Sequence, residues 1–279
     1  MRINTNVSSL TAQEAAQNTS KSVTGSLEKL STGLKINKAS DDASGLAIAD
    51  KLRTQATSIN QGISNGNSAV ALLQIADKSM SEQSNILDTV KAKLIQANTD
   101  TTSDDGRESI RKDINKLLTQ LDNIAAQTNY NGTSLLQAGP GTTTSSTGLK
   151  FQIGEKAGDL ITNGKIQANT SGLKLTSLKG LGTLTKVKAS GQQDVIDKAI
   201  TKLNGFRGDI GSTQNQVESA VRNLMTQATN VKAAESIIRD VDYAAESANF
   251  NKQNIISQAG SYAISQANAV QQNVLRLLQ

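Results

Sequence analysis

Apolar residues recur three or four positions apart along most of this chain, which is the spacing of one face of an α-helix. Near both ends the remaining positions are mostly Ala, Ser, Thr, Asn and Gln, so these helices would be marginal alone, because packing supplies most helical stability. We therefore expect the first and last helices to pair and to serve assembly. The two stripes are Ile3, Val7, Leu10, Val23, Leu27, Leu30 and Leu34, then Ile256, Ala259, Ala263, Ala267, Val270, Val274 and Leu277.

Longer helical patterns lie between the ends. The stripe from Asp41 to Asn98 contains no Pro and predicts a helix of roughly 80 Å at 1.5 Å per residue. Gly62 and Gly66 weaken it by about 1 kcal/mol each relative to Ala. A turn at Thr99–Gly106 precedes a shorter helix, and helical spacing resumes at Gln192.

The intervening segment is rich in Gly, Ser and Thr and begins with the turn signal Asn131-Gly132. Apolar residues alternate there at Leu149–Ile153, Leu160–Ile161 and Leu173–Leu175, and this alternation predicts small β-hairpins. The expected fold is mainly α: a long antiparallel helical coiled-coil rod with paired terminal helices and a small β-hairpin insert. The expected domains are 1–40 paired with 240–279, then 41–136 with 187–239, and a short β-rich variable region at 137–186.

Composition narrows the possible functions. Hydrophobic residues make up 36% and aromatic residues 2%, without Trp, so a narrow helical core fits better than a thick globular one. The absence of Cys and His excludes disulfides, thiol chemistry, imidazole bases and Cys/His zinc sites. The net charge of +5 comes from scattered Lys and Arg without stacking aromatics, which argues against nucleic acid as a partner. No apolar run is long enough to insert into a membrane, and the first residues do not form a secretory signal peptide.

Adjacent carboxylates at Asp41-Asp42 and Asp104-Asp105 could in principle bind a divalent cation. Helix capping is the favoured interpretation, because adjacent helical side chains diverge and Asp suits the positive end of a helix. No phosphate-binding loop is present. The sequence therefore predicts no catalytic, cofactor or metal site and no enzymatic activity.

The segment ASDDASGLAIADKLRTQ, residues 39–55, combines a predicted cap, acidic residues at a helix start, a Gly for close approach and side chains that face partners. It resembles the hallmark N-terminal segment of bacterial flagellins. Further segments resemble that family in the family's order: 1–6, 27–37, 127–132, 151–154, 240–246 and 266–278. The signature residues are Ser40, Asp41, Asp42, Gly45, Leu46, Ile48, Leu52 and Arg53.

The resemblance implies a structural subunit that polymerises with itself into the hollow bacterial flagellar filament used for swimming. It implies secretion as an unfolded chain through type III export to an extracellular flagellum. An export chaperone at the C-terminal helix, the filament cap and junction proteins are the implied partners, and no cofactor is implied. The implied assembly residues are Ile3, Val7, Leu10, Leu27, Leu30, Leu34, Ile256, Ala263, Val270, Val274 and Leu277.

The alternative is the hook–filament junction protein, a relative that shares the terminal helices but does not propagate. The complete 39–55 segment and the ending Leu277-Leu278-Gln279 favour flagellin. An enzyme inserted in the filament, such as a metalloprotease, would need His, and the sequence has none.

Some positions depart from the family pattern. Many flagellins engage an innate immune receptor through an Arg and a Leu of the first long helix and a Glu of the next. This chain has Thr89, Lys93 and Asp113 there, so we expect weak or absent receptor activation. Ile237 occupies a position where Arg is common.

Exposed Ser and Thr of flagellin outer regions are often O-glycosylated. The candidates, which could equally form a plain solvated loop, are Thr142, Thr143, Thr144, Ser145, Ser146 and Thr147.

Overall fold

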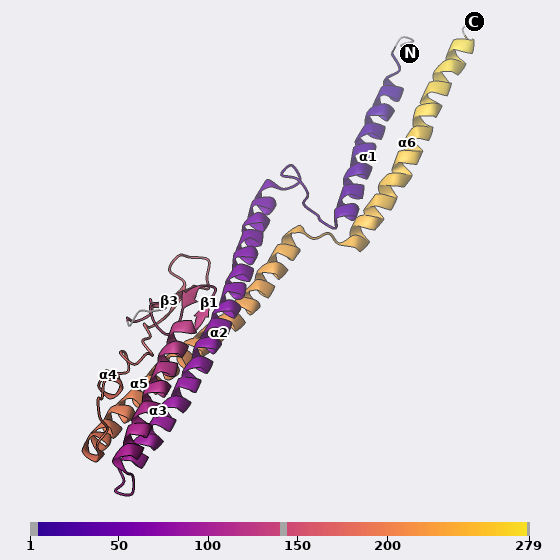
Figure 1. Cartoon of the computed structure of the whole chain (residues 1–279). Coiled ribbons are helices and arrows are strands. Elements are labelled where there is room, and N and C mark those ends of the chain that lie inside the picture. The colour runs from indigo at the N-terminus through magenta and orange to yellow at the C-terminus, as the bar shows by residue number, and fades with distance from the viewer. Residues whose placement is uncertain (1–4, 140–143, 278–279) are drawn as a thin grey trace. The chain divides into compact units, whose positions relative to one another are not determined.

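Helices account for most of the chain, as the spacing of apolar residues predicts (Figure 1). The computed structural model describes residues 5–139 and 144–277, with the backbone alone described for residues 271 and 273–277. The helices are α1 (Val7–Thr32), α2 (Ala43–Ala97), α3 (Asp104–Gln127), α4 (Thr176–Lys179), α5 (Lys186–Arg239) and α6 (Tyr243–Leu277). The strands are β1 (Asn129–Tyr130), β2 (Thr133–Ser134), β3 (Leu149–Gln152) and β4 (Leu160–Asn163).

The chain divides into two compact units. The terminal unit comprises Met1–Ala56 and Thr229–Gln279, and the central unit comprises Thr57–Ala228. Helices α2 and α5 each contribute to both units.

In the terminal unit, α1 and α6 lie side by side and antiparallel, so the predicted pairing of the first and last helices is confirmed (Figure 1). The side-chain amide of Asn6 donates to the Ala267 carbonyl at 3.1 Å, and that of Asn249 donates to Ser26 Oγ at 3.2 Å. The first bond joins the start of α1 to the last part of α6, and the second joins the last part of α1 to the start of α6. Asn6 also caps α1 by accepting from the Ser9 amide at 3.1 Å.

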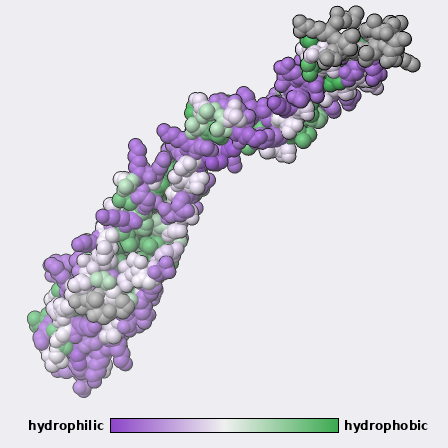
Figure 2. Space-filling model, turned by 90° about the horizontal axis from the view of Figure 1, so that it is seen from above, coloured by the Kyte–Doolittle hydropathy of each residue, from purple (hydrophilic) through white to green (hydrophobic). Residues whose placement is uncertain are grey.

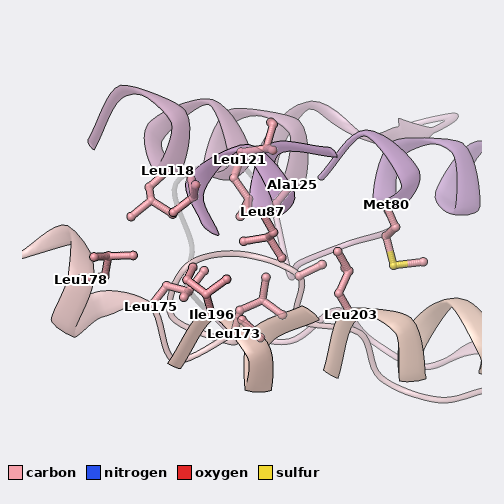
Figure 3. Close-up of a cluster of buried hydrophobic side chains, with 14 of the residues drawn as sticks. Met80, Leu87, Leu118, Leu121, Ala125, Leu173, Leu175, Leu178, Ile196 and Leu203 are labelled. Carbon is pink, nitrogen blue, oxygen red and sulfur yellow. The ribbon is translucent and has the colours of Figure 1, made fainter. Parts of the chain in front are cut away.

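The core of the central unit lies between α2, α3, α5 and the segment that connects α3 to α5 (Figure 3). Full burial of one Leu side chain contributes about 1.5–3 kcal/mol, so this core dominates the stability of the unit. Figure 3 labels Met80 and Leu87 of α2, Leu118, Leu121 and Ala125 of α3, Leu173, Leu175 and Leu178 of the connecting segment, and Ile196 and Leu203 of α5.

The connecting segment is anchored to α3 through one carboxylate. Asp122 accepts hydrogen bonds from the Thr170 amide at 2.8 Å, from Thr170 Oγ1 at 2.9 Å and from Lys179 Nζ at 2.7 Å. The side-chain amide of Gln83, fully buried on α2, donates to the Leu121 and Ala168 carbonyls at 3.1 Å and 2.8 Å. Polar bonds therefore fix the irregular segment at both neighbouring helices.

Two antiparallel hairpins interrupt the helices. Strands β1 and β2 are joined by Asn131 and Gly132, whose φ angles of 48° and 80° match the two-residue turn that Asn-Gly favours. Strands β3 and β4 pair Leu149 with Asn163 and Gln152 with Leu160. The predicted turn and the predicted hairpin at Leu149–Ile153 and Leu160–Ile161 are thus present.

The predicted strand at Leu173–Leu175 is wrong. Lys174 adopts a left-handed φ of 60°, and the amides of Leu173 and Leu175 donate to the carbonyls of Asn169 and Thr170. A turn therefore brings both leucines into the core, and their spacing of two arises without a strand.

Two helix starts also differ from the sequence prediction. Helix α5 begins at Lys186, before the predicted Gln192. The first helical hydrogen bond runs from the Ala189 amide to the Thr185 carbonyl. Helix α2 is not capped by Ser40, which lies in the preceding turn. Instead, Asp42 Oδ1 accepts the Gly45 amide at 2.9 Å, as a capping side chain does.

Candidate functional site

The seam between α1 and α6 is built mainly from small and polar side chains. A Cβ at Gly260 would lie 3.7 Å from the Ala16 Cβ, so the two backbones approach closely there. The buried or half-buried positions at coiled-coil-like spacing are Ser9, Ala12, Ala16, Thr19, Val23, Ser26 and Leu30 on α1, and Gln253, Ser257, Gly260, Ile264 and Ala267 on α6. The apolar stripes read from the sequence are therefore not the main contact between the two helices.

Most of the large apolar side chains of the pair face away from the seam. Seven such residues form what we call the terminal apolar set, and between 42% and 79% of each is exposed. They are Val7, Leu10, Leu27, Ile255, Ile256, Tyr262 and Val270. Hydrophobic surface is visible in green along the terminal helices in Figure 2. An isolated subunit thus leaves unburied the groups whose burial is most favourable.

The predicted assembly residues fall into several environments. Ala263 is exposed and Leu30 is half-buried. Leu34 lies beyond the end of α1, because Gly33 leaves the helix with a left-handed φ of 74°. Ile3 and the side chains of Val274 and Leu277 lie outside the described residues. The predicted assembly residues do not include Ile255 and Tyr262, because neither lies on the apolar stripe. Only their large apolar side chains could have indicated them from the sequence.

The junction between the terminal pair and the longer helices is tied by backbone bonds. Leu34 and Asp240 form an antiparallel bridge, with the Lys35 amide donating to the Arg239 carbonyl at 2.6 Å and the Val241 amide to the Gly33 carbonyl at 3.0 Å. The Tyr243 hydroxyl donates to the Leu30 carbonyl at 3.1 Å. The segment that follows α1 and the segment that joins α5 to α6 are therefore hydrogen-bonded to each other.

The signature segment, residues 39–55, lies in the same terminal unit. Asp41 Oδ2 accepts the amides of Asn37 and Lys38 at 3.1 Å and 3.0 Å, and these bonds lower the pKa of its carboxyl group. Gly45 is buried, and a Cβ there would lie 2.8 Å from Ile36 Cδ1. A side chain at this position would therefore have to displace the ends of the Ile36 and Asp42 side chains at the start of α2.

The residues of the signature segment that are expected to face partners differ in exposure. Ile48 is 51% exposed, whereas Leu46 and Leu52 are half-buried. Arg53 forms an exposed ion pair with Asp50 at 2.9 Å. Ile48 therefore offers the largest uncovered apolar surface in this segment.

Two of the three positions expected to correspond to receptor-binding residues pair with each other. Lys93 Nζ lies 3.1 Å from Asp113 Oδ2, which links α2 to α3. The exposed Thr89 bonds its hydroxyl to the Asn85 carbonyl of its own helix at 2.9 Å. This surface thus presents no guanidinium and no apolar side chain at the three positions.

One candidate glycosylation residue is buried in the folded chain. Ser146 is 3% exposed and its Oγ accepts the Ile166 amide at 3.0 Å, so an enzyme that transfers a sugar could not reach it in this conformation. Thr144 and Thr147 are exposed and Ser145 is half-buried, while Thr142 and Thr143 lie outside the described residues.

The acidic pairs act at helix starts. Asp104 and Asp105 occupy the first turn of α3, where Ser103 is the cap and accepts the Gly106 amide at 3.1 Å. Within the described part of the chain, no three His, Cys, Asp or Glu residues gather as a metal site would require. No described helix combines the length and apolar character needed to cross a membrane.

Comparison with known proteins gives the same family at both ends of the chain. Residues 3–139 match the family model described as the bacterial flagellin N-terminal helical region, and residues 193–278 match the bacterial flagellin C-terminal helical region. The chain is 34% identical to the flagellar filament 33 kDa core protein of Treponema phagedenis, with 100% of both chains covered.

Two solved structures are similar. The crystal structure of Bacillus cereus flagellin matches with a TM-score of 0.50 and 28% identity, covering 62% of this chain and 94% of that one. A Vibrio parahaemolyticus structure described as a flagellar hook-associated protein matches with a TM-score of 0.60, covering 71% and 99%. Its identity of 12% shows a shared fold alone.

Proposed function

The chain belongs to the bacterial flagellin family and is a structural subunit of the flagellar filament, and from this premise we propose that its terminal helix pair is the polymerisation surface. Flagellins are structural proteins and the chain is not an enzyme. The expected domain division follows from this role: 1–40 with 240–279 for assembly, 41–136 with 187–239 as the long-helix part, and 137–186 as the variable part.

The terminal apolar set is the observation that carries the proposal. Its side chains are too exposed to contribute much to the stability of one subunit, and burial against neighbouring copies would remove them from water at about 25 cal/mol per Å². The seam, built mainly from small and polar side chains, holds α1 against α6 without using the terminal apolar set. Each terminal pair can therefore present them to the next subunit.

The thin seam also suits export. Residues of the pair bury little apolar surface within one chain, so keeping them unfolded costs little free energy. We infer that the chain is secreted unfolded through the flagellar type III route and folds at the growing extracellular filament, where it contributes to swimming. An export chaperone that covers the C-terminal helix, the filament cap and junction proteins are the partners that this route requires.

A matched pair of variants tests the assembly surface. Ile255→Glu adds a charge to the terminal apolar set, and Val187→Glu adds the same charge to an 82%-exposed residue of the central unit. Circular dichroism should give the same helix content for both monomers. We expect Ile255→Glu to abolish seeded polymerisation, measured by sedimentation and electron microscopy, and Val187→Glu to polymerise like the parent. Normal filaments from Ile255→Glu would refute the proposal.

A truncation of α6 provides a second test of the proposed polymerisation surface. Deleting residues 274–279 should leave a chain that stays in solution when filament seeds are added. Growth of filaments at the parental rate would show that polymerisation does not need this end of α6.

The hook–filament junction protein is the second candidate, because a hook-associated protein shares the fold. Identity of 34% over the whole length of a filament core protein favours the filament subunit. Electron microscopy of the purified protein separates the two, because a junction protein caps a joint and should not form long filaments alone.

Two surface properties belong to the same proposal. We infer that Thr89, Lys93 and Asp113 leave the chain with weak or no activation of the innate flagellin receptor. Thr144 and Thr147, with Ser145 less accessible, are the described positions open to O-glycosylation. Intact mass of the native protein tests the sugar, because the bare polypeptide mass would exclude it.

A further inference from the structure

Four Asn-Gly pairs occur in the chain: Asn65-Gly66, Asn131-Gly132, Asn163-Gly164 and Asn204-Gly205. Such a pair can react with itself, because the backbone nitrogen after Asn can attack the carbonyl carbon of the Asn side chain. Gly has no Cβ to hinder that approach. The reaction requires a free nitrogen and a backbone that can rotate into the attacking geometry, so folding decides which pair reacts.

Helices protect two of the four pairs. Gly66 and Gly205 lie inside α2 and α5, where backbone amides donate to the carbonyl four residues earlier. The Asn65 side chain is held as well, since its Nδ2 donates to the Gln152 carbonyl at 3.1 Å. Either helix would have to open locally before its glycine nitrogen could attack.

Burial protects the third pair. Asn163 is 4% exposed at the end of β4, and its Oδ1 accepts a hydrogen bond from Thr213 Oγ1 of α5 at 3.2 Å. This bond restrains the side-chain amide, and burial limits access of the water that the second step needs.

Asn131 lacks all of these protections. Asn131 and Gly132 are exposed in the turn between β1 and β2, and a Cβ at Gly132 would meet nothing within 4 Å. Among the described residues, neither the Asn131 side chain nor the Gly132 amide has a hydrogen-bond partner. The hairpin that carries the turn has only two residue pairs, so its opening costs little.

We propose that Asn131 is a spontaneous deamidation site of the folded protein. The Gly132 nitrogen attacks Cγ of Asn131, an N–Cγ bond forms, and the side-chain nitrogen leaves as ammonia after receiving the proton of the Gly132 amide. Water then opens the resulting five-membered imide at either carbonyl and yields aspartate or isoaspartate. Water is the only co-reactant, and no oxidant or reductant takes part.

The two products differ in their effect on the hairpin. Aspartate tolerates the left-handed φ of 48° at residue 131 nearly as well as Asn does. Isoaspartate adds a methylene to the backbone, so the two-residue turn can no longer pair Tyr130 with Thr133. The isoaspartate form should therefore lose the β1–β2 pairing.

Trypsin places the four pairs in four different peptides, so one digest measures all of them. The peptides are 54–78 for Asn65, 117–150 for Asn131, 157–165 for Asn163 and 203–207 for Asn204. The full chain is incubated at mildly alkaline pH, folded or in urea, and digested briefly at lower pH beside an unincubated sample. Mass spectrometry follows the conversion of amide to acid, and an isoaspartyl methyltransferase labels the isoaspartate product.

We expect Asn131 in the folded chain to react at least about tenfold faster than each other pair, which corresponds to local opening that costs about 1.4 kcal/mol or more. In urea, the four rates should converge to within a few-fold. Equal rates in the folded chain, or faster reaction at another pair, would overturn the proposal. The result does not depend on whether the chain polymerises through its terminal helices.

Discussion

Gly62 of α2 lies directly against the backbone carbonyl of Ile153, so closely that a Cβ at residue 62 would overlap the carbonyl oxygen. One turn further along α2, Asn65 donates to the neighbouring Gln152 carbonyl at 3.1 Å. The β3–β4 hairpin is thus docked on α2 at a position that only Gly can occupy. This contact explains a residue that would otherwise weaken a long helix.

Replacing Gly62 by Ala should destabilise the central unit. A gain of about 0.5–1 kcal/mol in helix propensity is outweighed by overpacking against rigid backbone, which typically costs about 1–3 kcal/mol. Gly205→Ala on α5 is the matched control, since a Cβ there meets nothing within 4 Å, and it should stabilise. Urea unfolding followed by circular dichroism measures both changes. Stabilisation by both substitutions would show that the hairpin does not rest on Gly62.

Asp122 should contribute more stability than another carboxylate of the same helix. Asp122→Ala leaves the Thr170 amide and hydroxyl and the Lys179 ammonium without their acceptor, at a cost of about 1–3 kcal/mol. Asp113→Ala removes a single exposed ion pair with Lys93 and should cost less than about 1 kcal/mol. Urea unfolding of the two variants compares them, and equal costs would contradict the role of Asp122 as an anchor.

Most of the helices could be predicted because each long helix repeats its apolar spacing over many turns. The Leu173–Leu175 segment could not, because alternate burial also arises when a turn with a left-handed residue at Lys174 points two leucines the same way. The cap of α2 was misplaced by two residues, since Ser40, Asp41 and Asp42 are all suitable capping residues. Only the hydrogen bond from Gly45 to Asp42 distinguishes them.

The pairing of the first and last helices was predicted, but the faces through which they pair were not. The apolar stripes placed assembly at the two ends, but they suggested that the stripes face each other. In the structure, Ala16 and Gly260 allow a close approach of the backbones, and the larger Val7 and Ile256 stay outside. Sequence spacing alone cannot tell which face of a helix meets its partner inside the chain when small residues can form that contact.

Acidification should weaken the loop before α2. The pKa of Asp41 is held below its ordinary value of 3.8 by the amides of Lys38 and Asn37, so its contribution is complete above pH 3.8 and is lost as the pH falls below that value. Asp41→Asn should therefore be less stable than the parent at neutral pH, with a gap that narrows under acid. Glu14→Gln, on the exposed part of α1, controls for loss of one charge. Urea unfolding across the acid range measures the gap, and a constant gap would argue against this linkage.

Restoring the family pattern at three positions should increase activation of the innate flagellin receptor. Lys93 and Asp113, which form an ion pair at 3.1 Å, and Thr89 are the positions proposed to correspond to the Arg, Leu and Glu of the family pattern. In the triple variant Thr89→Arg, Lys93→Leu and Asp113→Glu, each charge-assisted hydrogen bond gained contributes about 1.5–3 kcal/mol, so potency should rise about tenfold or more. Reporter cells treated with monomeric protein measure the dose response. Lys91→Leu, which breaks the exposed pair with Asp197, is the control and should leave potency unchanged. If the parent chain already matches the potency of an enteric flagellin, these three positions do not limit recognition.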